Sequence, residues 1–169
     1  MILLDSKVAL LTGSGRGIGA AAAKLFASEG ASVVVCDLDP TPANETVEAI
    51  TGAGGKAIAV PGDMTDPAFP EQLVQKTIES FGGLDVIVNN AGYTWDATIH
   101  KMTDKQWQAM LDIHVTAPFR LIRAAAPFIR ETAKKEHEQQ GHANARKIVN
   151  VSSVSGTAGN AGQANYSTK

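Results

Sequence analysis

A glycine-rich segment and the acid that follows it are the residues whose types and order suggest chemistry. The segment reads Thr12-Gly13-Ser14-Gly15-Arg16-Gly17-Ile18-Gly19. It lies between a short apolar run and a helix-forming stretch, and a second apolar run, residues 33–36, ends in Asp37. Glycines permit a tight turn and a close approach of backbone to a ligand. A helix that begins at such a turn directs free N–H groups and a positive dipole end at a bound anion.

The order of strand, turn, helix, strand and acid predicts a site for the pyrophosphate of a dinucleotide. Glycine-rich turns without any ligand are common, so the prediction depends on the whole order. Asp37 at the tip of the second strand can accept hydrogen bonds from the ribose hydroxyls of NAD, and it would repel the extra phosphate of NADP. Arg16 by itself favours NADP, but we expect Asp37 to dominate and predict NAD as the cofactor.

Polar residues also follow three further apolar runs. Asp63-Met64 follows the third run, Asn89-Asn90-Ala91-Gly92 the fourth, and Ser152-Ser153 the fifth. Each cluster alone is explained by a turn, since Asp, Asn and Gly are turn formers. Ligands of open α/β sheets bind outside the carboxyl ends of the strands. We therefore expect these residues to converge on one crevice.

The elements that must position these residues alternate between strands and helices. We predict strands at residues 7–12, 32–37, 56–60, 84–89 and 147–152. We predict helices at residues 17–29, from Thr41-Pro42 to 51, from Asp66-Pro67 to 81, and from the capping box Thr103-Asp104-Lys105-Gln106 onward. Pro118 and Pro127 should kink the last helix, whose apolar face includes Trp107, Leu111, Val115 and Ile122. Residues 131–146 should form its exposed end and a loop, with His137 and His142 in solvent rather than at a metal.

The apolar runs are continuous rather than alternating, which is typical of a parallel sheet covered on both faces. Strands that alternate with helices give an α/β fold. We predict a Rossmann-like, doubly wound parallel sheet in a single domain over residues 1–169, without an internal repeat or a clear linker.

Composition excludes several classes of protein. The chain has 169 residues, 44% hydrophobic and 19% charged, which is typical of a globular protein. The net charge of −2 gives no reason to expect nucleic acid or an anionic membrane as partner. Cys36 is the only cysteine, so no internal disulfide or cysteine-rich metal site is expected. We expect a buried thiol, no signal peptide, no membrane-spanning segment and a cytoplasmic location.

The sequence resembles the short-chain dehydrogenase/reductase family over essentially its whole length. The resemblance depends on Thr12-Gly13-x-x-x-Gly17-x-Gly19, Asn89-Asn90-Ala91-Gly92, Ser153 and Gly162-Gln163-Ala164-Asn165-Tyr166. Within the family, residues 160–166 are most similar to 3-oxoacyl-thioester reductases and 3-hydroxyacyl-CoA dehydrogenases.

The resemblance implies hydride transfer between NAD(H) and a carbonyl or secondary alcohol of a 3-oxoacyl or 3-hydroxyacyl thioester. A steroid, sugar or small alcohol is the alternative substrate, and a dinucleotide-binding protein without turnover is the alternative function. Tyr166 would be the general acid or base, helped by a lysine ammonium, and Ser153 would stabilise charge on the substrate oxygen. The implied cofactor contacts are Gly13, Ser14, Arg16, Gly17, Ile18, Gly19, Asp37, Leu38, Asp63, Met64, Asn90, Ala91, Gly92 and Tyr166. The resemblance also implies homodimers or homotetramers, since relatives commonly pair through the last long helix and the helix that begins near Tyr166.

Two positions depart from the family pattern. His114 stands where many members have an asparagine that positions a water in a proton relay. An imidazole can donate and accept hydrogen bonds, so we include His114 among the catalytic residues; the alternative is a helix histidine that faces a polar gap.

The second departure is the lysine. The family motif places it four residues after the tyrosine, whereas Lys169 comes three residues after Tyr166. Lys169 would need a rotated helix to take this role. We therefore expect the lysine, further strands and the substrate-binding segment to lie outside these residues. The sheet edge beyond residues 147–152 should then be uncovered.

Overall fold

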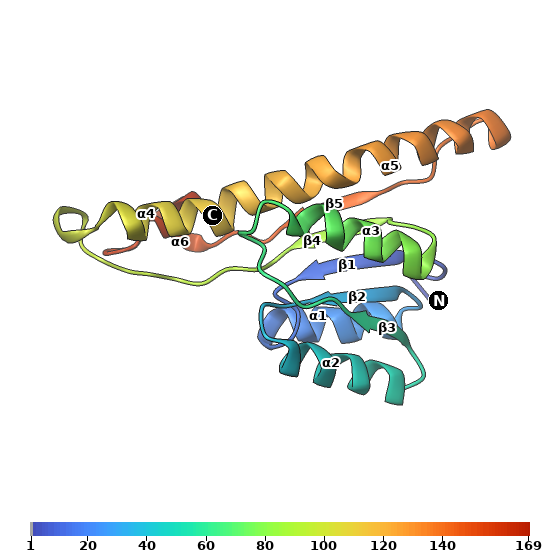
Figure 1. The fold of residues 1–169 in the computed structure, drawn as a ribbon, viewed down its shortest axis with the longest axis horizontal. Helices are drawn as coiled ribbons and strands as arrows, with labels where there is room; N and C mark the ends of the chain where they lie inside the picture. Colours follow the sequence, from blue (N-terminus) through green and yellow to red (C-terminus); the bar gives the residue numbers. More distant parts are fainter. Residues whose placement is uncertain (1) are drawn as a thin grey trace.

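The computed structural model describes residues 2–169, which form a five-stranded parallel sheet flanked by helices (Figure 1). The strands are β1 (Val8–Thr12), β2 (Ser32–Cys36), β3 (Lys56–Ala59), β4 (Val86–Asn89) and β5 (Lys147–Asn150). Their order in the sheet is β3-β2-β1-β4-β5, and every neighbouring pair is parallel. This arrangement confirms the predicted Rossmann-like fold.

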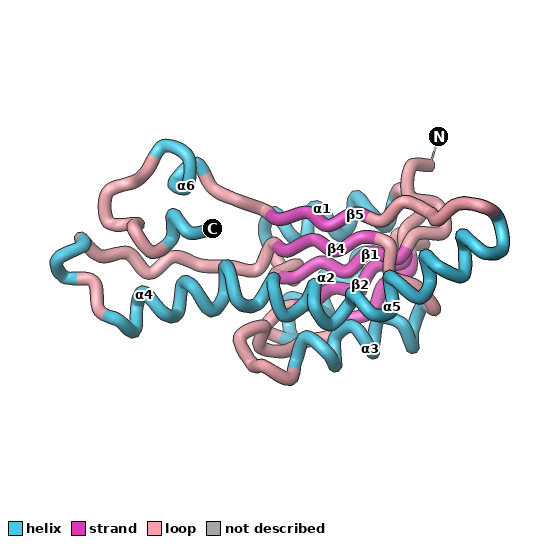
Figure 2. The backbone as a smooth tube through the Cα atoms, turned by 90° about the horizontal axis from the view of Figure 1, so that it is seen from above, coloured by secondary structure: helices cyan, strands magenta, loops and turns pink. Residues whose placement is uncertain are grey.

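Helices cover both faces of the sheet (Figures 1 and 2). On one face, α1 (Gly17–Ser28) and α2 (Pro40–Gly52) pack on Ala9 and Leu11 of β1. On the other face, α3 (Phe69–Phe81), α4 (Asp104–Leu111) and α5 (Ala117–Gln140) pack on Leu10 of the same strand. Successive residues of a strand point to opposite faces, so a strand buried on both faces reads as a continuous apolar run.

Two helices begin at other residues than predicted. Asp39, not Thr41, is the N-cap of α2, because its carboxylate accepts a hydrogen bond from the N–H of Thr41 at 3.0 Å. In the second case Asp66 accepts from the N–H of Ala68 at 2.9 Å, which closes a turn, and α3 begins only at Phe69. Short Asp side chains form such local turns as readily as helix caps.

The predicted capping box of Thr103 and Gln106 opens α4. The chain then passes through a π turn, η2 (Asp112–Thr116), directly into α5. Pro118 lies in the first turn of α5 and Pro127 lies inside it, yet α5 runs unbroken to Gln140. Two residues of the predicted apolar face are largely exposed: Trp107, which precedes the π turn, is 40% exposed, and Val115, which lies within it, is 45% exposed.

An ion pair joins the end of α5 to the loop before β5. The carboxylate of Glu136 accepts hydrogen bonds from both terminal nitrogens of Arg146, at 3.0 and 2.7 Å. It also accepts from the backbone N–H of Asn144 at 2.9 Å. The hydrogen bonds from Arg146 and then Asn144 lower the pKa of Glu136 to about 2. The segment 131–146 is thus a helix end and a loop, as predicted, but the loop is tied back to the helix.

Glu136→Gln is expected to lower the unfolding temperature at neutral pH, because it removes the charge that pairs with Arg146. An unfolded glutamate titrates near about 4.3, whereas the folded one has a pKa of about 2. The advantage of the wild type should therefore be complete above about pH 4.3 and disappear as pH falls toward 2. Thermal unfolding followed by circular dichroism across this range tests it, with Glu138→Gln as control. Equal unfolding temperatures at pH 7 would contradict the prediction.

Three further features concern earlier predictions. Cys36 is buried, and burial followed by the charge of Asp37 raises the pKa of its thiol to about 12, which makes it unreactive at neutral pH.

β5 is an edge strand whose residues are all exposed, which agrees with the predicted uncovered edge. Among residues 2–169, no helix combines the length and the apolar character that crossing a membrane requires.

Candidate functional site

The glycine turn lies between β1 and α1 and is packed too closely for side chains at Gly13, Gly15 and Gly19. Gly13 has φ +60°, and a Cβ there would lie 2.7 Å from the Cα of Ala91. A Cβ at Gly19 would overlap the carbonyl of Gly13. The turn therefore presses against the end of β4, which leaves its backbone open to a ligand on the other side.

Asn90 fastens the end of β4 to this turn. Its Nδ2 donates to the carbonyls of Thr12 and Gly13 at 3.0 and 2.9 Å. In return, the hydroxyl oxygen of Thr12 accepts from the N–H groups of Asn90 and Ala91. Asn90 thus holds the turn in shape in addition to lining the cavity described below.

Asp37 lies just beyond β2, beside the same turn. One carboxylate oxygen accepts from the N–H of Gly15 at 2.9 Å, and the other accepts from the N–H of Asp39 at 3.2 Å. Arg16 pairs with Asp39 at 2.9 Å through exposed side chains. The Arg16 guanidinium is therefore paired with a carboxylate, and both Arg16 and Asp37 line the cavity described next.

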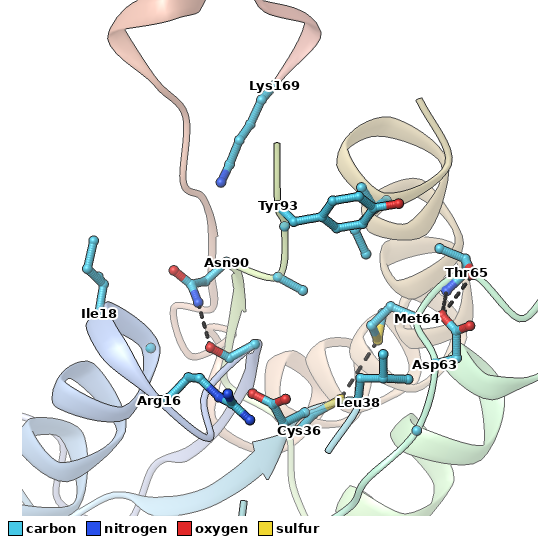
Figure 3. Close-up of a pocket in the computed structure, with 17 residues that line it drawn as sticks. Arg16, Ile18, Cys36, Leu38, Asp63, Met64, Thr65, Asn90, Tyr93 and Lys169 are labelled. Atoms are coloured by element: carbon cyan, nitrogen blue, oxygen red, sulfur yellow. Dashed lines mark hydrogen bonds between the residues drawn. The ribbon is translucent and has the colours of Figure 1, made fainter. Parts of the chain in front are cut away.

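A cavity of about 680 Å³ opens where the carboxyl ends of the strands meet (Figure 3). Its lining includes most of the predicted cofactor residues, namely Gly13, Arg16, Ile18, Gly19, Asp37, Leu38, Asp63, Met64, Asn90, Ala91 and Gly92. It also includes residues that the sequence analysis did not select, namely Cys36, Gly62, Thr65, Tyr93 and Ile113. Thr65 directly follows the predicted pair Asp63-Met64, and Tyr93 directly follows the predicted cluster that ends at Gly92. Their positions in the sequence could therefore have identified them as lining residues.

Three predicted cofactor residues, Ser14, Gly17 and Tyr166, do not line this cavity. Ser14 is fully buried, and its hydroxyl donates to the carbonyl of Leu11 at 2.6 Å and accepts from the N–H of Cys36. It therefore ties β1 to β2. Gly17, with φ +57°, begins α1.

Tyr166, His114 and Lys169 come together beside the cavity. Tyr166 begins a 3₁₀ turn, η3 (Tyr166–Thr168), and its ring lies edge-on to His114 with centroids 5.1 Å apart. The ammonium of Lys169 lies 5.6 Å from the centroid of the Tyr166 ring and points into the cavity (Figure 3). Residues three apart eclipse each other in a 3₁₀ helix. The 3₁₀ turn therefore places Lys169 on the same side of the chain as Tyr166. In an α-helix the two residues would be rotated relative to each other.

Asn165 anchors the segment that carries Tyr166. The side chain of Asn165 is fully buried, and its Oδ1 accepts from the N–H of Tyr166 at 2.9 Å. Its Nδ2 donates to the carbonyls of Trp95 and Gln106 at 3.0 and 3.2 Å. The loops that follow β4 and β5 leave the same end of the sheet, and the C-terminal end of the chain, marked C, lies between them (Figure 2).

Ser153 caps a short helix, whereas Tyr166, His114 and Lys169 lie together beside the cavity. It is the N-cap of α6 (Val154–Ala158), where its hydroxyl oxygen accepts from the N–H of Ser155 at 3.2 Å. It does not line the cavity that holds the glycine turn. A hydroxyl can accept and donate at once, so the proton of Ser153 is free for another acceptor.

His114 lies in the π turn η2 and is only 8% exposed. Its Nε2 lies 2.9 Å from the carbonyl oxygen of Tyr93. Burial lowers the pKa of His114; the hydrogen bond to Tyr93 opposes this shift, and the charge of Lys169 adds to it. The imidazole is therefore neutral at neutral pH.

Comparisons with known proteins agree with this geometry. A family model described as short chain dehydrogenase matches residues 7–169. The chain is 39% identical to the hydroxyacyl-CoA dehydrogenase ChsB1 of Mycobacterium tuberculosis, over 96% of this chain and 52% of that protein. It is also 39% identical to the 3-oxoacyl-[acyl-carrier-protein] reductase FabG of Vibrio cholerae, over 96% of this chain and 61% of that protein.

A solved structure is similar as well. The crystal structure of a short chain dehydrogenase from Mycobacterium avium superposes with a TM-score of 0.90 and 38% identity, covering 98% of this chain and 59% of that one. The chain thus spans between one half and two thirds of the length of these relatives. Since the family model matches nearly every residue and the fold agrees, the chain belongs to the short-chain dehydrogenase family of oxidoreductases.

Proposed function

We propose that the protein transfers a hydride between NAD(H) and carbon 3 of a 3-oxoacyl or 3-hydroxyacyl thioester. The observation that carries the proposal is the cavity shared by the glycine turn, Asp37 and the Lys169 ammonium, with Tyr166 at its side. Two relatives named for acyl-CoA and acyl-carrier-protein substrates support the substrate class.

The residues present fit a nicotinamide dinucleotide. The cavity volume of about 680 Å³ lies within the ordinary range for ligand sites. The backbone from Gly13 to Gly19 would hold the pyrophosphate at the start of α1. Asp37 would accept from the ribose hydroxyls, and Asp63 and Met64 would flank the adenine. When bound, the nicotinamide supplies or accepts the hydride.

The protein's own groups would handle the proton and the developing charge. The hydroxyl of Tyr166 would donate its proton to the substrate oxygen in reduction and recover it in oxidation. The ammonium of Lys169 lies 5.6 Å from the centroid of the Tyr166 ring, next to the place where this exchange would occur. The hydroxyl of Ser153 would donate a hydrogen bond to the same substrate oxygen and stabilise the charge that develops on it.

Turnover of acetoacetyl-CoA by the purified protein tests the proposal. We expect NADH oxidation that depends on the thioester, and a higher kcat/KM with NADH than with NADPH. The acid at the end of β2 is the reason for the second expectation. Turnover confined to sugars, steroids or simple alcohols would refute the substrate class. Tight NADH binding without turnover on any of these substrates would refute the enzymatic proposal.

We also propose a homodimer or homotetramer, supported by apolar side chains that α5 and η2 leave exposed. Phe119 is 56% exposed and Val115 is 45% exposed. Most soluble homo-oligomers are closed and symmetric, so a self-complementary helix face suits this assembly. A cytoplasmic location stays a prediction, based on the single, buried Cys36.

A further inference from the structure

The side-chain amide of Gln163 makes hydrogen bonds to three separate parts of the chain. Gln163 comes three residues before Tyr166 and does not line the cavity. Its Nε2 donates to Oδ2 of Asp96 at 2.9 Å. Its Oε1 accepts from the hydroxyl of Ser155 at 2.7 Å and from Nδ2 of Asn160 at 2.9 Å. One side chain therefore joins the loop after β4, the helix α6 and the segment that leads to Tyr166.

The carboxylate of Asp96 determines how this amide is oriented. A carboxylate only accepts hydrogen bonds, so the nitrogen end of the Gln163 amide must face Asp96. The oxygen end then faces Ser155 and Asn160, both of which carry hydrogens to donate. The reverse orientation would place an oxygen against the carboxylate. The hydrogen-bond network therefore assigns one orientation to the bridge between Asp96 and Ser155.

Ser155 extends this bridge to Ser153. Ser155 is only 5% exposed, and its hydroxyl is the group that donates to Gln163. Its backbone N–H donates to the hydroxyl oxygen of Ser153 at 3.2 Å. The place of Ser155 therefore determines where the hydroxyl of Ser153 lies.

Gln163 also holds the 3₁₀ turn that carries Tyr166. Its carbonyl oxygen accepts from the backbone N–H of Ser167 at 2.9 Å. Helix α6 packs closely on this turn, since a Cβ at Gly156 would lie 3.3 Å from the carbonyl oxygens of Ser167 and Lys169. Gln163 is thus bonded both to the helix that Ser153 caps and to the turn that Tyr166 begins.

We propose that Gln163 is a positioning residue, which sets the distance between the hydroxyls of Ser153 and Tyr166 by bridging Asp96 and Ser155. The inference rests on the proposed function, in which both hydroxyls reach one substrate oxygen. Neither residues 91–98 nor residues 159–165 form a helix or a strand, so side-chain hydrogen bonds have to hold them together. An error of about 1 Å in the place of a catalytic group costs about 10²-fold in rate.

Steady-state kinetics of Gln163→Ala with acetoacetyl-CoA and NADH test this role. We expect kcat to fall about 10- to 100-fold, with the KM for NADH unchanged because Gln163 does not line the cavity. In a Ser153→Ala background the same change should cost about twofold or less, because the hydroxyl that it positions is already absent. Equal losses in the two backgrounds would overturn the inference. A higher KM for the thioester at unchanged kcat would also overturn it, since that result indicates direct contact with the substrate.

Two variants of α6 serve as a matched pair in these assays. Ser155→Ala removes the donor to Gln163 and should lower kcat in the same way as Gln163→Ala. Thr157→Val also removes one hydroxyl from this helix, but that hydroxyl is exposed and donates only to the carbonyl of Val154, at 3.2 Å. We expect Thr157→Val to match the wild type. Equal kcat values for Ser155→Ala and Thr157→Val would contradict the path through Ser155.

Reversing the donor and acceptor of the bridge gives a test that needs no turnover. The carboxylate introduced by Gln163→Glu still accepts from Ser155 and Asn160, but it faces the carboxylate of Asp96. We expect a lower unfolding temperature at pH 7, together with a lower kcat. Adding Asp96→Asn supplies a donor at that end and should restore both quantities. A double variant no better than Gln163→Glu alone would overturn the inference.

The two measurements separate this inference from the proposed function. Absence of thioester turnover in the wild type would refute the proposed function, and the catalytic role of the bridge with it, while the unfolding temperatures would still show whether the bridge exists. Turnover in the wild type with additive losses in Gln163→Ala and Ser153→Ala would refute the inference alone.

Discussion

Replacing Tyr166 with phenylalanine is expected to lower kcat by about 10²- to 10⁴-fold, the usual contribution of a positioned proton donor. The ring of Tyr166 packs on the core beside α4 and α5 and lies edge-on to His114, and phenylalanine keeps these contacts. Only the hydroxyl is lost, so NADH affinity should change little. Steady-state assays with acetoacetyl-CoA and fluorescence titration with NADH separate the two effects.

A matched control comes from the same 3₁₀ turn. Ser167→Ala also removes one hydroxyl, which donates to the carbonyl of Gln163 at 2.9 Å. We expect this variant to turn over at a rate close to that of the wild type. If Tyr166→Phe were as active as Ser167→Ala, then Tyr166 would not be the proton donor.

Changing Asp37 should alter the choice between NADH and NADPH. Hydrogen bonds to a charged group contribute about 1.5–3 kcal/mol, so Asp37→Ala should weaken NADH binding roughly 10- to 100-fold. Asp37→Asn keeps an oxygen for the N–H of Gly15 and for a ribose hydroxyl, but it lacks the charge that repels a phosphate. This variant should therefore mainly gain affinity for NADPH. Equilibrium titrations with both cofactors measure each change.

Asp66→Asn is a suitable control for the cofactor experiment. Asp66 follows β3 in a turn before α3 and does not line the cavity. Its replacement removes one negative charge near the sheet and should leave the ratio of NADH to NADPH affinity unchanged. A wild type that binds NADPH more tightly than NADH would refute the role given to Asp37.

The sequence alone determined the elements whose signals are local. The glycine turn, the acid that directly follows the apolar run of β2, and the capping box at Thr103 can each be recognised from neighbouring residues. The strands that are buried on both faces of the sheet could also be predicted from the sequence. In β1, Leu10 packs on one face and its neighbours Ala9 and Leu11 pack on the other, so all three are apolar. The single domain over residues 1–169 stays a prediction. The crevice followed from a general rule of parallel sheets.

Only the tertiary structure decided how competing local arrangements were resolved. Asp39 and Thr41 are both plausible helix caps, and the observed hydrogen bond selects Asp39. Residue spacing alone did not predict the π turn that places His114, nor the 3₁₀ turn that brings Lys169 beside Tyr166. Contacts between distant residues hold the chain around the site: Asn90 bonds Thr12 across 78 positions, and Asn165, which directly precedes the 3₁₀ turn, bonds Trp95 across 70. Local alternatives differ by little free energy, so packing and hydrogen bonds formed across the fold determine which one is adopted.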